Sequence, residues 1–364
     1  MKLLSRLALA FLLTLGGAAF AQSGAGGKQD EAPAQATEQQ RAVAQPGNNA
    51  PVWREVRSGE PNYTSIPGRE TNVLIQPGAR FLGQSRFTTA GEAWRQFRNG
   101  PLTFIGGWLV VLVLLAIAAV YFVKGPVKLH EPPTGRKMLR FTDFERIVHW
   151  SVAISFCVLG ISGLTMLFGK YVVLPVIGYT LFGWLTNLLK NLHNFVAPFF
   201  IVSVLVMVLM WARDNLPRAV DFQWLNPMKI WGFFSRGEHI SSGRFNGGEK
   251  VWFWAGVLVL SVAVSWSGVI LLFPNFDQTR AVMQDAWIWH ASAALLYVCA
   301  ALGHIYMGTI GVQGAYENMR QGYTDETWAK EHHDLWYREQ KGKQSSGGAS
   351  GAVPAGAPHM KEKP

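Results

Sequence analysis

Long apolar runs separated by shorter polar stretches set the pattern of this chain. A helix needs about 20 apolar residues in succession to cross a hydrocarbon core of about 30 Å. Five runs after the first 21 residues reach that length, at 104–123, 147–168, 191–212, 251–273 and 287–312. Their length and composition predict an all-α membrane protein with five transmembrane helices.

The N-terminus carries another apolar run, which is too short to span a membrane. Lys2 and Arg6 precede an apolar core at 7–15, and small residues follow up to Ala21. This order is typical of a secretory signal peptide, so we interpret 1–21 as an export signal.

Polar segments flank the predicted spans. Residues 22–103 begin with a Gly-, Ala- and Gln-rich stretch and hold a brief β-like run at 73–75, which favours a periplasmic linker and docking segment. After the last span, we expect a cytoplasmic C-terminal segment at 313–340. The Gly-, Ser-, Ala- and Pro-rich residues 341–364 are predicted to be a disordered tail.

The composition predicts a membrane protein, and the charge distribution predicts its orientation in the membrane. Hydrophobic residues make up 49% of the 364 residues and charged residues only 15%, a mixture too apolar for most soluble domains. The loops at 124–146 and 213–250 hold twelve Lys and Arg, whereas the loops on the opposite side hold three. Because cytoplasmic loops are enriched in positive charge, we expect a bacterial inner-membrane protein with a periplasmic N-terminus and a cytoplasmic C-terminus. The same bias explains the net charge of +10 without nucleic-acid binding, although Arg95 and Arg98 lie on the outer side of the first span.

The cysteines exclude two kinds of redox centre. Only Cys157 and Cys299 are present, both inside apolar runs. An iron–sulfur cluster generally takes four thiolates, and a c-type haem needs a C-x-x-C-H motif. Any haem in this chain is therefore bound without a covalent link.

Four histidines lie inside or at the edge of the predicted spans: His149, His193, His290 and His304. Ionisable residues at membrane depth are costly and mark functional sites, and imidazole is a common ligand of haem iron. We interpret the four as axial ligands of two haem b groups. The other histidines lie in loops or the tail and are interpreted as solvated: His130, His239, His332, His333 and His359.

Depth along the helices pairs these histidines. His290 and His304 are 14 residues apart on the fifth span, a rise of about 21 Å, and they return to within about 40° of the same face. His193 opens the third span from the periplasmic side, and His149 opens the second from the cytoplasmic side. We therefore predict His193 with His290 at a periplasmic-side haem, and His149 with His304 at a cytoplasmic-side haem. Arg146 precedes His149 by three residues, as Lys190 does His193, and both are candidate partners of haem propionates.

Further motifs extend from the second span to the tail. They are FERIVHW at 144–150, GRFNGGEK at 243–250 leading into WFW at 252–254, His304 followed by Ile-Tyr-Met, and WAKEHHDLWYRE at 328–339. Together these motifs resemble the membrane γ subunit of respiratory formate dehydrogenase, and the 328–339 motif is the most discriminating. The resemblance implies a four-helix di-haem cytochrome b core at 140–312, preceded here by one extra transmembrane helix at 104–123 and an exported N-terminal segment.

The resemblance implies a role in electron transfer and a set of partners. In that family a molybdenum- or tungsten-containing catalytic α subunit oxidises formate in the periplasm. An iron–sulfur β subunit then passes the electrons to the γ subunit, which reduces membrane quinone (menaquinone or ubiquinone) on the cytoplasmic side. By the same resemblance, Asn246, Gly248, Glu249 and His304 are the candidate quinone-binding positions, and the chain itself carries no catalytic residue for formate oxidation. An Asn can hydrogen-bond a quinone carbonyl and a Gly lets a ring approach the backbone, although Asn246 and its glycines are equally typical of a turn before a helix.

Two alternatives stay open from the sequence. One is the cytochrome b subunit of a nickel–iron hydrogenase or of a sulfur-compound reductase, which shares the di-haem arrangement but has another partner. The other is a haem-free membrane transporter or assembly protein, in which the histidines relay protons or pack against neighbouring helices.

Overall fold

The structure, a computed structural model, describes residues 90–274, 276 and 278–347. The predicted signal peptide, residues 22–89 of the exported segment and the β-like run at 73–75 lie outside the described residues, as does the tail from residue 348.

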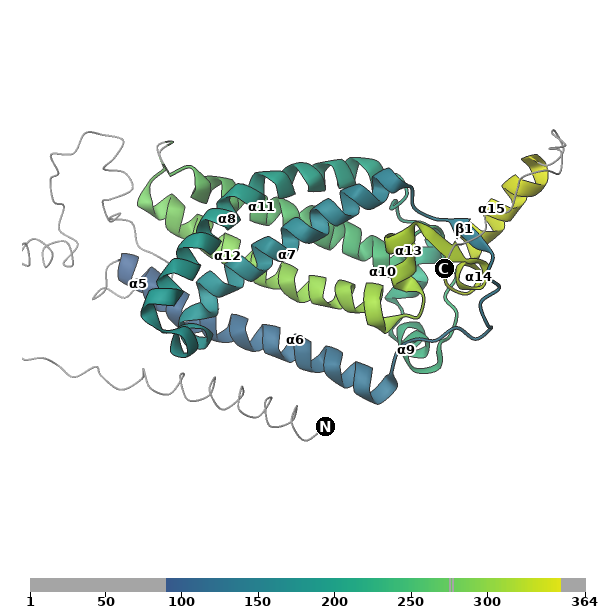
Figure 1. Cartoon of the computed structure of the whole chain (residues 1–364), viewed down its shortest axis with the longest axis horizontal. Coiled ribbons are helices and arrows are strands. Elements are labelled where there is room, and N and C mark those ends of the chain that lie inside the picture. Colours follow the sequence, from purple (N-terminus) through teal and green to yellow (C-terminus); the bar gives the residue numbers. More distant parts are fainter. Residues whose placement is uncertain (1–89, 275, 277, 348–364) are drawn as a thin grey trace, which may run out of the picture. The chain divides into compact units, whose positions relative to one another are not determined.

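Long helices dominate the described chain (Figure 1). Five stretches are long and apolar enough to cross a membrane, as predicted: Gly91–Lys124, Asp143–Val172, Leu174–Trp211, Gly247–Leu272 and Arg280–Gly311. They correspond in order to α5 (Ala90–Phe97), η1 (Arg98–Leu102) and α6 (Thr103–Lys124); α7 (Asp143–Val172); α8 (Leu174–Trp211); α10 (Gly247–Val251), η3 (Trp252–Leu260) and α11 (Ser261–Leu272); and α12 (Arg280–Tyr306) and η4 (Met307–Gly311). The chain is therefore an all-α membrane protein in its spanning part.

The third helix is much longer than its predicted span. The apolar run at 191–212 is the second half of α8, which begins at Leu174. Near its start the helix is interrupted at Gly178, whose φ of 76° lies in the left-handed region that glycine adopts without strain. The apolar residues after Gly178 continue the helix toward the span, so the helical segment is longer than the membrane requires.

Short elements follow and connect the spans. They are β1 (Lys137–Leu139), η2 (Ala219–Leu225), α9 (Pro227–Arg236), α13 (Ala315–Gln321), β2 (Tyr323–Asp325), α14 (Glu326–His332) and α15 (Asp334–Gly347). β1 pairs antiparallel with β2, with Met138 opposite Thr324. Helix α15 continues through residues 341–347, which composition alone predicts to be disordered.

The described residues form two compact units. The first contains 90–116, 150–206 and 256–302, and the second contains 117–149, 207–255 and 303–347. Each unit holds one of the two predicted histidine pairs.

The first unit is a bundle of helices with close small-residue contacts. A Cβ added at Gly106 of α6 would lie 2.5 Å from Cδ1 of Leu295 on α12, so glycine permits this approach. The Phe156 ring of α7 lies 4.6 Å from that of Tyr297 on α12, and the Tyr297 hydroxyl meets Oγ of Ser261 on α11 at 2.8 Å. These contacts join four of the long helices within this unit.

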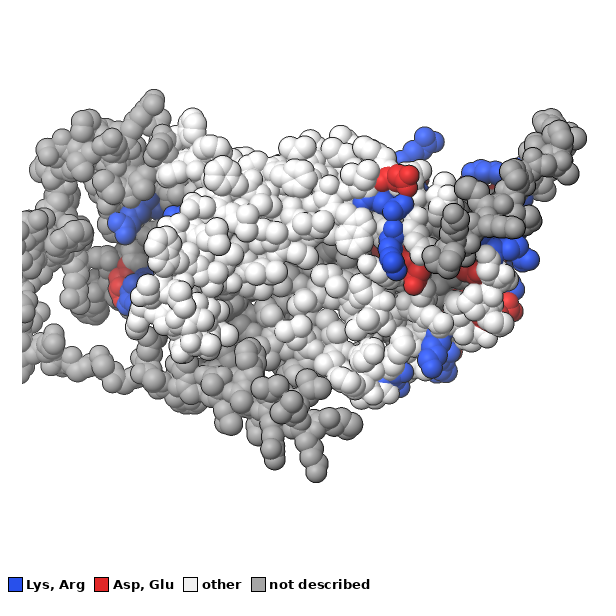
Figure 2. Space-filling model, viewed as in Figure 1, with Lys and Arg blue, Asp and Glu red and all other residues white. Residues whose placement is uncertain are grey.

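The second unit gathers the charged segments around a small core. Val127, Phe233, Ile240 and Val312 form a buried cluster, and Trp328 of α14 is buried as well. Charged side chains on the visible face gather over α13 and the neighbouring short elements, with a further group near α5, whereas the rest of the surface of the long helices is white (Figure 2). This division is expected where lipid covers the helices and water covers the connecting segments.

Two tail histidines contradict the sequence interpretation. His333 is only 1% exposed and His332 is half-buried, although both were expected to be solvated. Nδ1 of His333 lies 2.7 Å from the carbonyl oxygen of Gly243, a contact between segments 90 residues apart that no local pattern predicts.

Candidate functional site

His193 of α8 and His290 of α12 face each other in the first unit. Their ring centroids are 6.2 Å apart, with an interplanar angle of 73°. Both side chains are half-buried. The first unit therefore brings together the two histidines that depth matching assigned to the periplasmic side.

The Nδ1 atoms of both rings are engaged by neighbouring groups. Nδ1 of His193 lies 2.8 Å from Oγ of Ser162. Nδ1 of His290 lies 3.0 Å from the carbonyl oxygen of Val264 and 3.2 Å from Oγ of Ser267. Such a contact fixes the tautomer and the ring orientation, which leaves Nε2 of each ring to act as a ligand.

Each of these serines is followed by a glycine that lies against the same imidazole. A Cβ added at Gly163 would be 3.6 Å from Cε1 of His193, and one added at Gly268 would be 3.2 Å from Cε1 of His290. Neither serine nor Gly268 was expected from the sequence. The signal that could have found them is the Ser-Gly dipeptide, which stands at 162–163 and again at 267–268.

His149 of α7 and His304 of α12 form the second pair, in the second unit. Their ring centroids are 6.4 Å apart, with an interplanar angle of 54°. The indole of Trp252 stacks on His304 at 4.8 Å and 13°, and Trp211 lies 6.4 Å from His149. His149 is half-buried and His304 is exposed. Aromatic rings thus hold the orientation of this pair, where serines do so for the first.

The two separations match the spacing expected for a shared iron atom. A metal–imidazole nitrogen bond is about 2 Å long and the ring centre lies about 1.2 Å further, so two axial imidazoles place their centres roughly 6.3 Å apart. The observed 6.2 and 6.4 Å fit this value. Among the described residues no group of three or more His, Cys, Asp or Glu side chains assembles as a metal-ion site. The ring spacing of each histidine pair fits a bis-histidine haem.

The two predicted propionate partners differ in their surroundings. The Arg146 guanidinium donates to the carboxylate of Asp143 at 2.7 Å and to the carbonyl oxygens of Gln321 and Arg320 at 3.2 and 2.8 Å. These carbonyls end α13, where a cation is favourable. Lys190 is exposed and makes no hydrogen bond or ion pair within the described part of the chain. For both residues, contact with a propionate stays a prediction.

The predicted quinone residues form the start of α10. Oδ1 of Asn246 accepts from the backbone N–H of Glu249 at 2.8 Å, and Oε2 of Glu249 accepts from the N–H of Asn246 at 2.7 Å. This reciprocal capping box uses the Asn246 carbonyl and leaves its amide N–H₂ group to donate elsewhere. One helical turn further, Trp252 stacks on His304, which places the start of α10 close to the second histidine pair.

The glycines beside Asn246 are tightly enclosed. A Cβ added at Gly248 would lie 3.2 Å from Oδ1 of Asn246, and one added at Gly247 would lie 2.7 Å from both the Asp221 carbonyl oxygen and the Trp224 side chain. Glycine is therefore required for packing at 247, and a side chain at 248 would crowd the capping oxygen of Asn246.

A repeated motif, not among those recognised in the sequence, connects the cap of α10 with the cap of α7. The pattern Arg-Phe-Thr/Asn-x-x-Glu stands at 140–145 and at 244–249. In the first copy Thr142 and Glu145 cap each other as Asn246 and Glu249 do, with Glu145 Oε2 accepting from the Thr142 N–H at 2.8 Å. Helix α7 carries His149, and the helix that begins with α10 carries Trp252. The two caps therefore fix where the helices that carry these two residues begin.

The arginines of the two copies cross over. Arg140 donates to the Glu249 carboxylate at 3.2 Å, and Arg244 donates to the Glu145 carboxylate at 2.6 Å. Glu145 also accepts from the indole N–H of Trp211 at 2.9 Å. Arg140 is buried, and this burial lowers its pKa below the ordinary value while Glu249 opposes the shift. We call this arrangement of Arg140, Glu145, Arg244 and Glu249 the arginine clasp.

The C-terminal motif at 328–339 holds the loop that precedes α10. Besides the contact of His333 with Gly243, the Asp334 carboxylate accepts from the Ser242 N–H at 2.9 Å, and the Leu335 N–H donates to the Ser242 carbonyl at 3.1 Å. Burial, reinforced by the charge of Arg140, lowers the pKa of His333 well below its usual range, so the ring is neutral and donates from Nδ1 to the carbonyl. The tail is thus part of the framework behind the candidate quinone residues.

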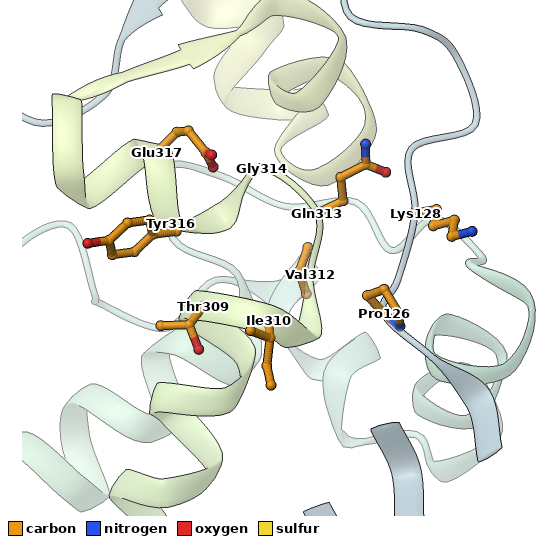
Figure 3. A pocket seen from close by; sticks show the side chains of 9 residues that line it. All are labelled: Pro126, Lys128, Thr309, Ile310, Val312, Gln313, Gly314, Tyr316 and Glu317. Carbon is orange, nitrogen blue, oxygen red and sulfur yellow. The ribbon is translucent and has the colours of Figure 1, made fainter. Parts of the chain in front are cut away.

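A pocket of about 620 Å³ opens elsewhere in the second unit. It is lined by residues after α6 and around η4 and α13: Pro126, Lys128, Thr309, Ile310, Val312, Gln313, Gly314, Tyr316 and Glu317 (Figure 3). None of the predicted haem or quinone residues lines it, so it is separate from the site described above.

Comparison with known proteins places this arrangement among membrane cytochromes. The profile of the prokaryotic cytochrome b561 family matches residues 140–320. The chain is 33% identical over 204 residues to the formate dehydrogenase cytochrome b556(fdo) subunit of Escherichia coli K12, covering 56% of this chain and 92% of that protein. It is 30% identical over 214 residues to the nitrate-inducible cytochrome b556(Fdn) subunit of the same organism, with the same coverage. The formate dehydrogenase cytochrome b556 subunit of Haemophilus influenzae is 26% identical over 214 residues, covering 56% of this chain and 84% of that subunit.

Proposed function

Because this chain belongs to the family of formate dehydrogenase cytochrome b subunits, we propose that it carries electrons from periplasmic formate oxidation to membrane quinone. It is an integral membrane cytochrome b with an electron-transfer role. The finer assignment, two haem b groups with quinone reduction on the cytoplasmic side, is the proposal.

The observation that supports it most is the presence of two separate histidine pairs. Each pair has the ring spacing of an axial bis-imidazole site, and each lies in its own unit with its own supporting residues. Haem iron, when bound, supplies a one-electron carrier at each position. The chain's contribution is to present Nε2 of His193 and His290 from fixed rings, and to hold His304 against Trp252.

The charge distribution supports the membrane orientation on which the proposed direction of transfer depends. The loops at 124–146 and 213–250 carry twelve Lys and Arg, against three in the loops on the opposite side, so they belong on the cytoplasmic side. This assignment puts His193 and His290 at the receiving, periplasmic end and His149 and His304 at the delivering, cytoplasmic end.

We place the chain in the bacterial inner membrane, with its N-terminus in the periplasm and its C-terminus in the cytoplasm. Its proposed partners are the molybdenum- or tungsten-containing α subunit and the iron–sulfur β subunit. The names of the relatives and the 328–339 motif support these partners over a hydrogenase.

We propose that quinone binds at the start of α10. The Asn246 amide donates to a quinone carbonyl, Gly248 admits the ring, and His304 lies behind Trp252 on the cytoplasmic side. Glu249 holds the cap and pairs with Arg140. Quinone reduction takes up two electrons and two protons, and Glu249, the partly exposed carboxylate of the cap, passes the protons from water to the quinone one at a time.

Haem counting in the purified complex tests the two-haem assignment. We expect two b haems per chain in reduced-minus-oxidised spectra, and one each in His193→Ala and His304→Ala. The control His130→Gln changes an exposed histidine and should keep both haems. A colourless protein from haem-sufficient cells would instead support a transporter or assembly role, and reduction by hydrogen but not by formate would support a hydrogenase partner.

A cap-preserving substitution tests the quinone assignment. Serine is a good N-cap, so Asn246→Ser should keep the start of α10 while removing the amide donor. We expect the KM for quinone to rise about fivefold in the intact complex, with electron transfer from formate to the haems unchanged, because one hydrogen bond is worth about 1 kcal/mol. The matched control is Asn226→Ser, since the side-chain oxygen of Asn226 also caps a helix, by accepting from the Met228 N–H at the start of α9. An unchanged KM in Asn246→Ser would contradict quinone binding by Asn246.

A further inference from the structure

Arg98 is a half-buried cation on the extra N-terminal helix, outside residues 140–320 that the family profile matches. It lies in η1, the π-helical start of the α6 span. Its guanidinium carbon is 4.6 Å from the ring centre of Trp287 on α12 and 5.5 Å from that of Trp94. The aromatic faces cover the planar group, and the N–H edges remain available to donate.

No carboxylate neutralises this guanidinium within the described part of the chain. Its neighbour Arg95, in contrast, is exposed and pairs with Glu92 at 2.7 Å. A half-buried charge without a counter-charge is costly, and an arginine at the predicted outer end of a span also runs against the charge bias of membrane proteins. Arg98 therefore calls for an anion that the described part of the chain does not supply.

The position of Arg98 indicates which anion. Arg98 packs on Trp287, which lies three residues before His290 on α12, so Arg98 packs within about one helical turn of a histidine of the first pair. All these residues belong to the first unit. Haem b carries two propionate carboxylates, and a guanidinium binds a carboxylate through two parallel hydrogen bonds.

Packing on both sides holds Arg98 in place. Before it, the indole N–H of Trp94 donates to the carbonyl oxygen of Gln284 at 3.2 Å, and Trp94 packs edge-on against Trp287 at 5.5 Å. After it, Gly106 packs closely on Leu295 of the same helix α12. The extra helix is thus attached to α12 both before and after the arginine.

We propose that Arg98 neutralises a propionate of the haem held by His193 and His290, and that it thereby raises the redox potential of this haem alone. The proposal rests on the two-haem assignment above. A nearby cation favours the reduced form of a haem, because reduction adds a negative charge. The extra helix, which lies outside the four-helix core, then positions the cation beside the haem that receives the electrons.

Redox titration of the two haems in the purified complex tests the proposal. In Arg98→Gln we expect the His193–His290 haem to become about tenfold harder to reduce, a downward shift of about 59 mV for one electron. The His149–His304 haem of the same molecule should keep its potential and serves as the internal reference. Arg98→Lys should retain most of the potential because the charge is kept. Arg95→Gln, the matched control in the same segment, should shift neither haem.

Each other outcome has a defined meaning. Equal shifts of both haems, no shift in Arg98→Gln, or the same shift in Arg98→Lys as in Arg98→Gln would overturn the proposal. Those results would indicate packing or contact with a lipid phosphate. Loss of only the His193–His290 haem in Arg98→Gln, with both haems kept in Arg98→Lys, would support it. Spectra with fewer than two haems in the unmodified complex would instead refute the two-haem assignment, so the two failures are distinguishable.

Discussion

Arg140 and Arg244 each donate a hydrogen bond to the backbone carbonyl of the other, at 2.8 and 2.7 Å. Since each also binds the capping glutamate of the opposite motif copy, the two arginines tie the starts of α7 and α10 together. The Phe141 and Phe245 rings that follow them lie 5.9 Å apart. The arginine clasp therefore couples the position of the start of α10, which holds candidate quinone residues, to the position of the start of α7, which carries His149.

Substitution of Arg244 by lysine should therefore affect both helices. A lysine ammonium cannot reach the Glu145 carboxylate, the Asp214 carboxylate and the Arg140 carbonyl at once, as the guanidinium does. We expect Arg244→Lys to lower the free energy of unfolding by about 2 kcal/mol, the loss of one or two charge-assisted hydrogen bonds. Thermal unfolding of the purified complex measures this, with Arg236→Lys, an exposed arginine, as the control. Equal midpoints for both variants would contradict a linking role of the clasp.

Two substitutions at Glu249 should separate its two contacts. Glutamine can complete a capping box but carries no charge, so Glu249→Gln should lose only the pairing with Arg140 and cost about 1 kcal/mol. Alanine loses the cap as well, and Glu249→Ala should cost about 2 kcal/mol. Quinol production by the intact complex adds a second measurement. A normal rate in Glu249→Gln at all pH values would exclude Glu249 as the proton supplier.

The Ser162 contact predicts a selective effect on one haem. Partners that orient a metal-binding histidine typically contribute 10–100-fold to metal affinity or activity. We expect Ser162→Ala to lower the affinity of the His193–His290 site for haem by about tenfold and to leave the other haem unchanged. Haem retention during dilution in detergent measures this. The control is Ser155→Ala, because Ser155 is a buried serine on the same helix that bonds only to backbone carbonyls of its own turn. Similar retention in the two variants would show that the contact with Ser162 is dispensable.

Burial of the tail histidines predicts a pH dependence. The pKa of His333 lies well below 6.5 and that of His332 is lowered to about 4, in both cases mainly by burial. A group whose pKa is depressed on folding stabilises the folded state above its unfolded pKa, and this contribution is lost as the pH falls. Protection of residues 326–339 from hydrogen exchange should therefore decrease from about pH 6.5 downward.

Asparagine provides the matched variant for that experiment. Its amide can donate to the Gly243 carbonyl in place of Nδ1, but it does not titrate near neutral pH. His333→Asn should therefore show a weaker pH dependence of exchange than the unmodified chain. An equally steep dependence in both proteins would assign the effect to other groups.

The membrane class, the five spans and the two histidine pairs can all be read from the amino-acid order. These features are local: an apolar run of sufficient length must form a helix in lipid because every backbone polar group has to be bonded within the segment. The depth of a histidine along its helix is likewise set by residue spacing. Counting residues along the spans therefore suffices to match His193 with His290 and His149 with His304.

The side chains that support those histidines depend instead on how the helices pack. Ser162 reaches His193 across 31 positions, Arg140 reaches Glu249 across 109, and His333 reaches Gly243 across 90. No helical or strand period relates such positions, because their contacts are created when separate helices come together. For the same reason His333 was wrongly expected to be solvated: its neighbours along the chain are polar, and the residues that bury it come from the loop before α10.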